Sequence, residues 1–339
     1  MVPSQVTKDT LFEPVPGWAK IPHGFWLREA TAVTVGPDDR VYVFNRGNMP
    51  MLVFDPDGNV VDHWGNDNPP EDVVIRRDSY GNALQFWNTW FKRTHAISTD
   101  HEGNLWLVDD VGCQIHKMSV TGEFLLTIGT GEQAPRESGR PFNRPTDVVV
   151  SKKTGEVFIS DGYGNSRIHR YSPDGEFIAS FGESGTAPGQ FSLPHNLALL
   201  DDEEIVVCDR ENHRVQVFSL DGEFHREWRA HKAVAVEVVG SGADARIYVA
   251  ERGPPPVQQG VARLGNRMDV FSRDGELITC FGAEHYGQEP DQFLWPHSVA
   301  VDSRGDVYVA EVSFVEWGRH QHPVVDNPAS LRKWRRVRG

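Results

Sequence analysis

Residues 194–229 read PHNLALLDDEEIVVCDRENHRVQVFSLDGEFHREWR, and this stretch decides the fold. It contains an opening apolar run after His195, a second run that ends at Arg210, a third run RVQVFS, and a last run after the turn SLDGEF. The pair Asp221 and Gly222 supplies the positive φ that a tight hairpin needs. Short apolar runs joined by such turns predict a small sheet of antiparallel strands.

The same arrangement recurs along the chain. Second runs that end on or near a polar residue are VYVFNR, LWLVDD, VFISDG, IVVCDR, IYVAER and VYVAEV, and the turns include DPDG, SVTG, SPDG, SLDG and SRDG. The copies stand roughly 40 to 65 residues apart, which is typical of propeller blades with some long loops. We therefore expect an all-β fold, a six-bladed β-propeller of four-stranded antiparallel blades that spans residues 1–339 as a single domain.

The two ends of the chain are expected to close the ring. The last copy finishes with LRKWRRV, which matches a third strand, and no fourth strand follows it. The stretch from Phe12 to Ile21 is predicted to supply that missing strand. Closure of this kind removes the exposed sheet edges that favour aggregation.

Three histidines occupy one equivalent position of the repeat in every second copy. They are His95 in THAIST, His195 in LPHNLAL and His297 in WPHSVAV, and the copies between them read ATAVTV, PTDVVV and AVAVEV. If the copies form a ring, the histidines reach the central axis from three sides. Three imidazoles with an open position are typical of a catalytic zinc site, although they accept other divalent ions too. One such histidine would be interpreted as a packed residue, but three in phase indicate metal binding.

Composition excludes several other classes of partner. The net charge of −14 argues against nucleic acid, and the basic cluster from Arg332 to Arg338 is interpreted as a solvated strand face. No apolar run approaches the length of a membrane span, and Met1 to Thr10 lacks the apolar stretch of a signal peptide. A cytoplasmic protein is therefore expected. Cys113, Cys208 and Cys280 have no metal-like spacing and are expected to be small buried residues.

Four strings carry a family resemblance: FNRPTDVVV, DGYGNSRIHRYSPDGEF, GQFSLPHNLAL and CDRENHRVQVF. They closely resemble the catalytic propeller of the peptidyl-α-hydroxyglycine α-amidating lyases, a branch of the NHL-repeat proteins. The resemblance is densest from Phe142 to Phe218. It implies zinc held by His95, His195 and His297, and cleavage of a carbinolamide into an amide and an aldehyde acid.

The resemblance also assigns three residues near the metal. The family's tyrosine matches Tyr163 in DGYG, and its two arginines match Arg210 in CDREN and Arg46 in FNRG. Tyr163 is then the candidate base for the substrate hydroxyl, and the arginines hold a substrate carboxylate or stabilise developing negative charge. In the alternative interpretation Tyr163 only packs against the next blade.

The arginines have an alternative as well. Arg46 and Arg210 could form ion pairs in the channel, with Asp109, Asp161 or Glu251 as partners. Arg252 matches no family residue and is interpreted as structural or substrate-selective.

This chain departs from the family at two kinds of position. The half-cystine pairs of the secreted lyases are replaced by Asn143 with Gly164 and by Val206 with Val217, which fits a reducing compartment. The family's aspartate ligand of a structural calcium is Ser298 here, so calcium is not expected.

Three insertions distinguish this chain from a bare propeller: residues 66–92, 253–266 and 313–328. Each lies near a strand end at the expected channel mouth, where functional loops gather on a rigid scaffold. They are expected to roof the site and restrict it to a small substrate.

The sequence thus favours a zinc-dependent lyase that acts on a small hydroxylated, carbinolamide-like or carboxylate-bearing molecule. The alternatives are a metal-dependent hydrolase or hydratase, and a non-catalytic propeller that binds a protein around a structural metal. A structural metal would require a fourth protein ligand, and no cysteine or acidic residue stands in the histidine position. The expected partner is a small molecule rather than nucleic acid or a membrane, and the sequence assigns no oligomeric state.

Overall fold

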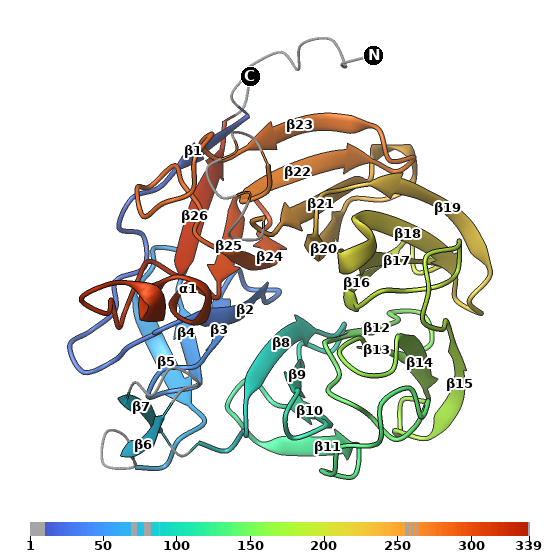
Figure 1. Cartoon of the computed structure of the whole chain (residues 1–339), viewed down its shortest axis with the longest axis horizontal. Helices are drawn as coiled ribbons and strands as arrows, with labels where there is room; N and C mark the ends of the chain where they lie inside the picture. The colour runs from blue at the N-terminus through green and yellow to red at the C-terminus, as the bar shows by residue number, and fades with distance from the viewer. Residues whose placement is uncertain are drawn as a thin grey trace.

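The computed structural model describes residues 11–68, 73–77, 83–87, 89–254, 258, 261 and 264–337. Within them, six four-stranded antiparallel sheets surround a central axis, as the sequence predicts (Figure 1). The hairpin turns have the predicted conformation, since Gly222 of the turn SLDGEF has a φ of +88°.

The first three blades follow one another along the chain and share one strand order. Their strands are β2 (Ala30–Val35), β3 (Val41–Asn45), β4 (Met51–Phe54) and β5 (Val60–Trp64); β8 (Thr94–Thr99), β9 (Leu105–Asp109), β10 (Gln114–Met118) and β11 (Phe124–Ile128); and β12 (Asp147–Val150), β13 (Val157–Asp161), β14 (Arg167–Tyr171) and β15 (Phe177–Phe181).

The next two blades repeat that order, and the sixth blade completes the ring. Their strands are β16 (Pro194–Leu200), β17 (Glu204–Asp209), β18 (Arg214–Ser219) and β19 (Phe224–Arg229); β20 (Ala233–Val239), β21 (Arg246–Glu251), β22 (Arg267–Ser272) and β23 (Leu277–Phe281); and β24 (Pro296–Val301), β25 (Val307–Glu311) and β26 (Leu331–Arg336). Short helices are η1 (Arg210–Asn212), η2 (Gly242–Asp244), α1 (Ser313–Glu316) and η4 (Gly318–His320).

The ring closes through the N-terminal segment. Strand β1 (Phe12–Pro14) pairs antiparallel with β26 and so becomes the fourth strand of the sixth blade. The predicted segment is longer than the observed strand, because β1 ends at Pro14, whose ring lacks the N–H that a ladder needs.

The first strand of each blade contacts the first strands of both neighbouring blades, so these six strands form the wall around the axis. Apolar clusters fill the spaces between neighbouring sheets. One contains Phe44, Phe91 and Leu105 between blades one and two, and another contains Val215, Ala233 and Val249 between blades four and five. The protein is therefore stabilised by packing of one blade on the next.

Two predictions about which side chains are exposed are partly wrong. Arg332 and Lys333 are buried rather than solvated, because they form ion pairs with Glu311 and Asp306. Cys113 and Cys208 are buried as expected, whereas the side chain of Cys280 on β23 is exposed.

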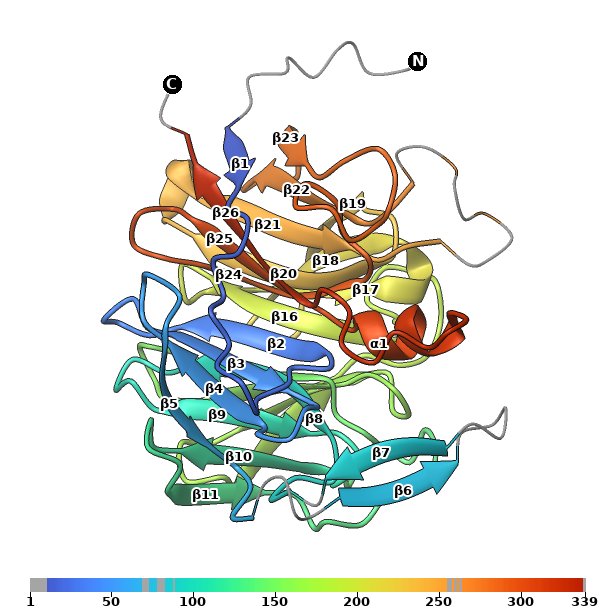
Figure 2. The ribbon, with the colours of Figure 1, turned by 90° about the vertical axis from the view of Figure 1, so that its left-hand side faces the viewer.

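The first and third insertions contain strands or helices among their described residues. Strands β6 (Val73–Arg77) and β7 (Ala83–Trp87) form a hairpin within the first, and α1 and η4 lie in the third. The hairpin and α1 project from the same face of the ring (Figure 2). None of the helices in the described part of the chain has the length and apolar character required to cross a membrane.

Candidate metal centre

Three histidines lie on the innermost strands of alternate blades, as the repeat predicts. His95 is in β8, His195 in β16 and His297 in β24. In each strand the pairing with the next strand skips the histidine, which leaves a β-bulge at that position. A bulge breaks the alternation of side chains and re-aims the residue that it leaves unpaired. The bulges therefore account for imidazoles that point towards the axis.

The three imidazoles converge. One ring nitrogen of each histidine lies within 4.8 Å of the corresponding atoms of the others, and the ring centres are 4.8 to 5.2 Å apart. The histidines are 1%, 1% and 8% exposed. This grouping is one that could hold a metal ion.

The second nitrogen of each imidazole fixes the orientation of the ring. Nδ1 of each histidine lies 2.7 Å from a backbone carbonyl oxygen of the next blade; the acceptors are Thr146 for His95, Val234 for His195 and Thr31 for His297. Since a carbonyl only accepts, Nδ1 carries the proton, and Nε2 keeps its lone pair. Metal-binding histidines usually have such a partner on the other ring nitrogen.

Burial keeps these imidazoles neutral. It lowers the pKa of His95 and His195 well below the usual value and that of His297 to about 3, and the positive charge of nearby arginines adds to the effect. Neutral imidazoles with inward lone pairs fit zinc or another divalent ion of similar preference. The donor set does not distinguish among these ions.

Tyr163 stands directly beside two of the histidines. Its phenol oxygen lies 2.9 Å from Nε2 of His95 and 3.4 Å from Nε2 of His195. The preceding residue, Gly162, permits this approach, because a Cβ at that position would lie 2.0 Å from the carbonyl oxygen of Pro194. The tyrosine that the family resemblance selects therefore contacts the candidate ligands.

The two predicted arginines lie near the histidines but do not have the partners considered from the sequence. Arg46 pairs with Glu29 at 2.6 Å and donates to the carbonyl of Thr94, and Arg210 pairs with Glu211 at 2.8 Å. Both arginines contribute positive charge that lowers the pKa of His297.

The carboxylates that end the second strands have a different role. Asp109, Asp161, Asp209, Glu251 and Glu311 are all buried and accept hydrogen bonds from backbone N–H groups of the segment that leads into the first strand of their own blade. They anchor the loops at the mouth of the channel, so ion pairs of Arg46 or Arg210 with them are not formed. A repeated acidic residue at the end of a second strand is therefore a structural signal in this chain.

Sequence reasoning missed a further set of charged residues at this end of the axis. Glu29, Arg93 and Arg144 each stand two residues before the position that holds a histidine in alternate blades. Arg93 and Arg144 both pair with the buried carboxylate of Asp110, and Arg144 lies over the ring of Tyr163, 4.4 Å from its centre. The shared offset from the repeat position is the signal that could have found them.

The third insertion is attached over blades five, six and one. The backbone N–H of Val315 in α1 donates to Glu29, and Glu316 pairs with Arg252, which follows β21. Glu29 thus holds both Arg46 and α1. This arrangement supports the expectation that residues 313–328 cover the histidine end of the axis.

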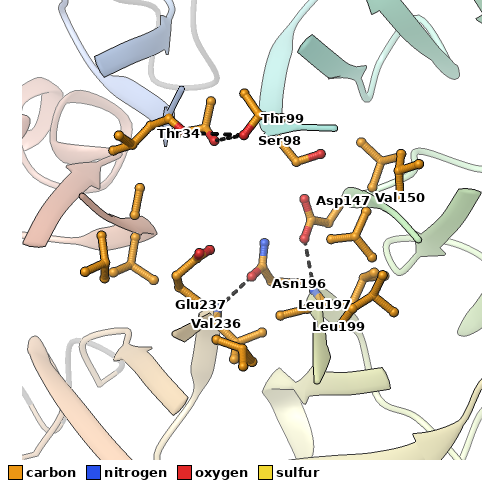
Figure 3. A pocket seen from close by; sticks show the side chains of 18 of the residues that line it. Thr34, Ser98, Thr99, Asp147, Val150, Asn196, Leu197, Leu199, Val236 and Glu237 are labelled. Carbon is orange, nitrogen blue, oxygen red and sulfur yellow. Dashed lines mark hydrogen bonds between the residues drawn. The ribbon is translucent and has the colours of Figure 1, made fainter. Parts of the chain in front are cut away.

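A cavity of about 570 Å³ occupies the axis beyond the histidines (Figure 3). Its walls are formed mainly by residues of the six first strands. Asp147 and Asn196 accept from backbone N–H groups of the next blade, and Ser298 does the same for Val33. Ser298 therefore has an inter-blade role at the position where the family has its calcium ligand. Burial raises the pKa of Asp147 to about 8 and that of Glu237 to about 7.

Comparisons with known proteins agree with the repeat and the ring. A family model described as NHL repeat matches residues 142–171 and 191–218. Virginiamycin B lyase from Staphylococcus aureus has a TM-score of 0.56 and 12% identity over 96% of this chain and 99% of that chain. At this identity the likeness shows the fold alone.

Relatives by sequence include amidating enzymes. Peptidyl-α-hydroxyglycine α-amidating lyase 1 of Drosophila melanogaster is 29% identical over 90% of this chain and 59% of its own length. Peptidyl-glycine α-amidating monooxygenase of Mus musculus is 36% identical over 65% of this chain, and the match spans 22% of the mouse protein. NHL repeat-containing protein 3 of Homo sapiens is 29% identical over 90% of this chain and 83% of its own length.

The match thus spans less than two thirds of the length of either amidating enzyme named above. The repeat model, the ring of six blades and the long matches lead to one assignment. The chain is a six-bladed β-propeller that contains NHL repeats at residues 142–171 and 191–218 and is homologous to the peptidyl-α-hydroxyglycine α-amidating lyases.

Proposed function

We propose that this protein is a metal-dependent lyase, with zinc as the expected ion, and that it splits a small carbinolamide-like substrate that carries a carboxylate. The observation that carries the proposal is the contact of Tyr163 with two of three convergent, neutral histidines. Names of relatives support the reaction class, because the Drosophila relative is called an amidating lyase. A cytoplasmic location stays a prediction.

The histidines would hold the metal through Nε2, while the carbonyl partners of Nδ1 keep the rings oriented. A bound zinc ion supplies a Lewis acid that makes a nearby hydroxyl group more acidic. Three protein ligands leave a position open, which is the arrangement of catalytic rather than structural zinc. This argues for the enzyme over a propeller pinned by a structural metal.

Tyr163 is the residue placed to move the proton. In its phenolate form it takes the proton of the substrate hydroxyl as the C–N bond breaks. The electron pair of that bond goes to nitrogen, which receives the proton, so the products are an amide and an aldehyde acid and nothing is oxidised or reduced. A positioned base of this kind contributes about 10²–10⁴-fold to rate.

Arg210 and Arg46 have different proposed roles. Arg210 uses only Nε on Glu211, and its Nη1 and Nη2 atoms have no hydrogen-bond partner among the described residues, so they suit a substrate carboxylate. Arg46 is already bonded through Nε, Nη1 and Nη2 to Thr94 and Glu29, and it therefore stabilises negative charge without clamping the substrate.

The test is parallel kinetics on a peptide ending in α-hydroxyglycine, on α-hydroxyhippurate and on a panel of small hydroxy acids, with the protein stripped by chelator and then reloaded with zinc. We expect activity that disappears with the metal, returns on reloading and is highest for a small substrate. Loss of the metal without loss of turnover would refute metal dependence. A much higher kcat/KM for the peptide would refute the preference for small substrates and leave the amidating reaction.

A further inference from the structure

Two arginines share a single buried carboxylate beside Tyr163. Asp110, at the end of β9, is fully buried. Arg93 binds it through Nε at 2.7 Å and through Nη2, and Arg144 binds it through Nε at 3.2 Å and Nη2 at 3.0 Å. Arginine is always charged in proteins, so two positive charges meet one negative charge, and one positive charge is left over.

Among the described residues, no carboxylate other than Asp110 forms an ion pair with these two guanidinium groups. Asp109 is next in the chain, but its oxygens accept from the backbone N–H groups of Lys92, Arg93 and Gly112. The charge of Asp109 is therefore directed at the loop backbone and not at the two side chains.

Both arginines also keep one hydrogen-bonding nitrogen available. Each uses its Nε and Nη2 edge on Asp110, and among the described residues Nη1 of Arg93 and Nη1 of Arg144 have no acceptor. The side chains of these arginines are 34% and 32% exposed, so their outer edges reach solvent. A site of this kind can bind an anionic oxygen group without breaking the bonds that hold it.

The pair faces the reaction centre from blades two and three. The guanidinium of Arg144 lies over the ring of Tyr163, whose phenol oxygen contacts His95. The guanidinium groups of Arg210 and Arg252 follow β17 and β21 in blades four and five, and blade five lies across the axis from blade two (Figure 1). A substrate at the histidines would therefore have cationic groups on two sides.

We propose that Arg93 and Arg144 form a second anion-binding subsite, and that the substrate carries two anionic groups, one for this pair and one for Arg210. The inference rests on the proposed function and sharpens its substrate class from a carboxylate to a dianion. The chain has a net charge of −14, yet positive charge is in excess at this one place. Such a local excess favours a role in anion binding over a role in solubility.

The test is calorimetric binding of acetate, malonate, succinate, glutarate and phosphonoacetate to the full chain, first free of metal and then loaded with zinc. We expect at least one dianion to bind about tenfold or more tightly than acetate in both forms. The dicarboxylate series gives the spacing of the two subsites, and phosphonoacetate tells whether the second group is a carboxylate or a phosphonate. Equal affinity for acetate and for all the dianions would overturn the proposal, and this comparison needs no variant.

Variants assign the effect to the pair. Arg93→Gln and Arg144→Gln should each remove most of the preference for the dianion over acetate. Arg170→Gln is the matched control, since Arg170 also bridges two carboxylates, Glu156 and Asp221, but on β14 away from the axis. If the pair is only a brace between blades, its variants will lower the melting temperature and retain the preference, which would refute the subsite.

Failure of this proposal can be told apart from failure of the lyase assignment. Dianion preference is measured on metal-free protein and needs no turnover. A protein that splits the small substrates but binds acetate and dianions equally retains the lyase function and loses the second subsite.

Discussion

The phenol oxygen of Tyr163 lies 2.9 Å from Nε2 of His95, the atom that His95 offers to a metal ion. Nδ1 of His95 already donates to Thr146, so the phenol must be the donor in this contact. The tyrosine proton and a metal ion therefore compete for one lone pair. Metal binding at His95 requires that this hydrogen bond be released.

Tyr163→Phe separates these two roles. Because the variant removes the competing donor, its metal affinity should equal or exceed that of the unchanged protein. Turnover should fall at least about a hundredfold, because the base is lost. Metal titration followed by steady-state kinetics on the metal-loaded variant checks both outcomes, and full activity would exclude Tyr163 from the reaction.

Replacement of any one of His95, His195 and His297 with Ala should weaken metal binding at least about tenfold, since loss even of an outer-shell partner costs that much. The fold should persist, because packing between blades does not depend on the metal. Elemental analysis and circular dichroism measure the two effects. His225→Ala is the control, since this imidazole lies on β19 and pairs with Glu204 on β17. Equal metal content in all four variants would contradict the assignment.

Glu29→Gln should destabilise the protein by about 1–3 kcal/mol, because one buried carboxylate holds both Arg46 and the N–H of Val315. Proteolysis within residues 313–328 should also become faster. The exposed pair of Lys153 and Glu203 provides a control, and Glu203→Gln should change stability by less than about 0.5 kcal/mol. Chemical denaturation and limited proteolysis give the comparison; equal effects would show that Glu29 does not hold α1.

The metal-free protein should lose stability as pH falls below about 6.5. Burial lowers the pKa of the three histidines in the folded state, so the unfolded chain binds more protons below that pH. Each histidine then costs about 1.4 kcal/mol per pH unit, and for His297 the cost continues to a pH of about 3. Denaturation from pH 5 to 7 should show a steeper slope for the native sequence than for a variant with Gln at all three positions. Identical slopes would refute the neutral triad.

Asp147→Asn should stabilise the protein, and the gain should grow as pH rises from about 4 towards 8. Burial raises the pKa of Asp147 to about 8, so the folded protein holds a proton there that the unfolded chain has released. An amide cannot titrate and still accepts from Leu197, as Asn196 does from Val236. A gain on the order of 1–3 kcal/mol at pH 7 is expected. Asn196→Asp is the matched reverse change, and it should lose stability over the same range.

The blades were predictable because each one repeats local signals, such as the apolar runs and the Asp-Gly turn at Gly222. The convergence of His95, His195 and His297 was predictable for the same reason, since one position in a closed ring repeats at a fixed angle. Their role as ligands and the roles of Tyr163, Arg46 and Arg210 stay predictions.

Side-chain pairing could not be predicted in this way. Glu29 lies near Arg46 because a backbone bond from Arg46 N–H to the Glu29 carbonyl joins the ends of two strands, and Arg252 meets Glu316 across two blades. These contacts depend on loops that differ from blade to blade, so no period in the sequence encodes them. The same limit explains why Asp110 was not recognised as the shared partner of Arg93 and Arg144.

Each imidazole of the triad bonds to a backbone carbonyl of the blade that follows it, and those blades contribute no histidine to the triad. Blades that donate these bonds and blades that accept them therefore alternate around the ring. This alternation is complete only when the number of blades is even. Deleting or duplicating one blade would place two blades with an axial histidine, or two blades without one, side by side, however well the new blade packed. The histidines use only the backbone carbonyls of Thr31, Thr146 and Val234. The side chains at these positions are constrained for another reason, because the buried hydroxyls of Thr31 and Thr146 form further hydrogen bonds and Val234 packs in the core between blades.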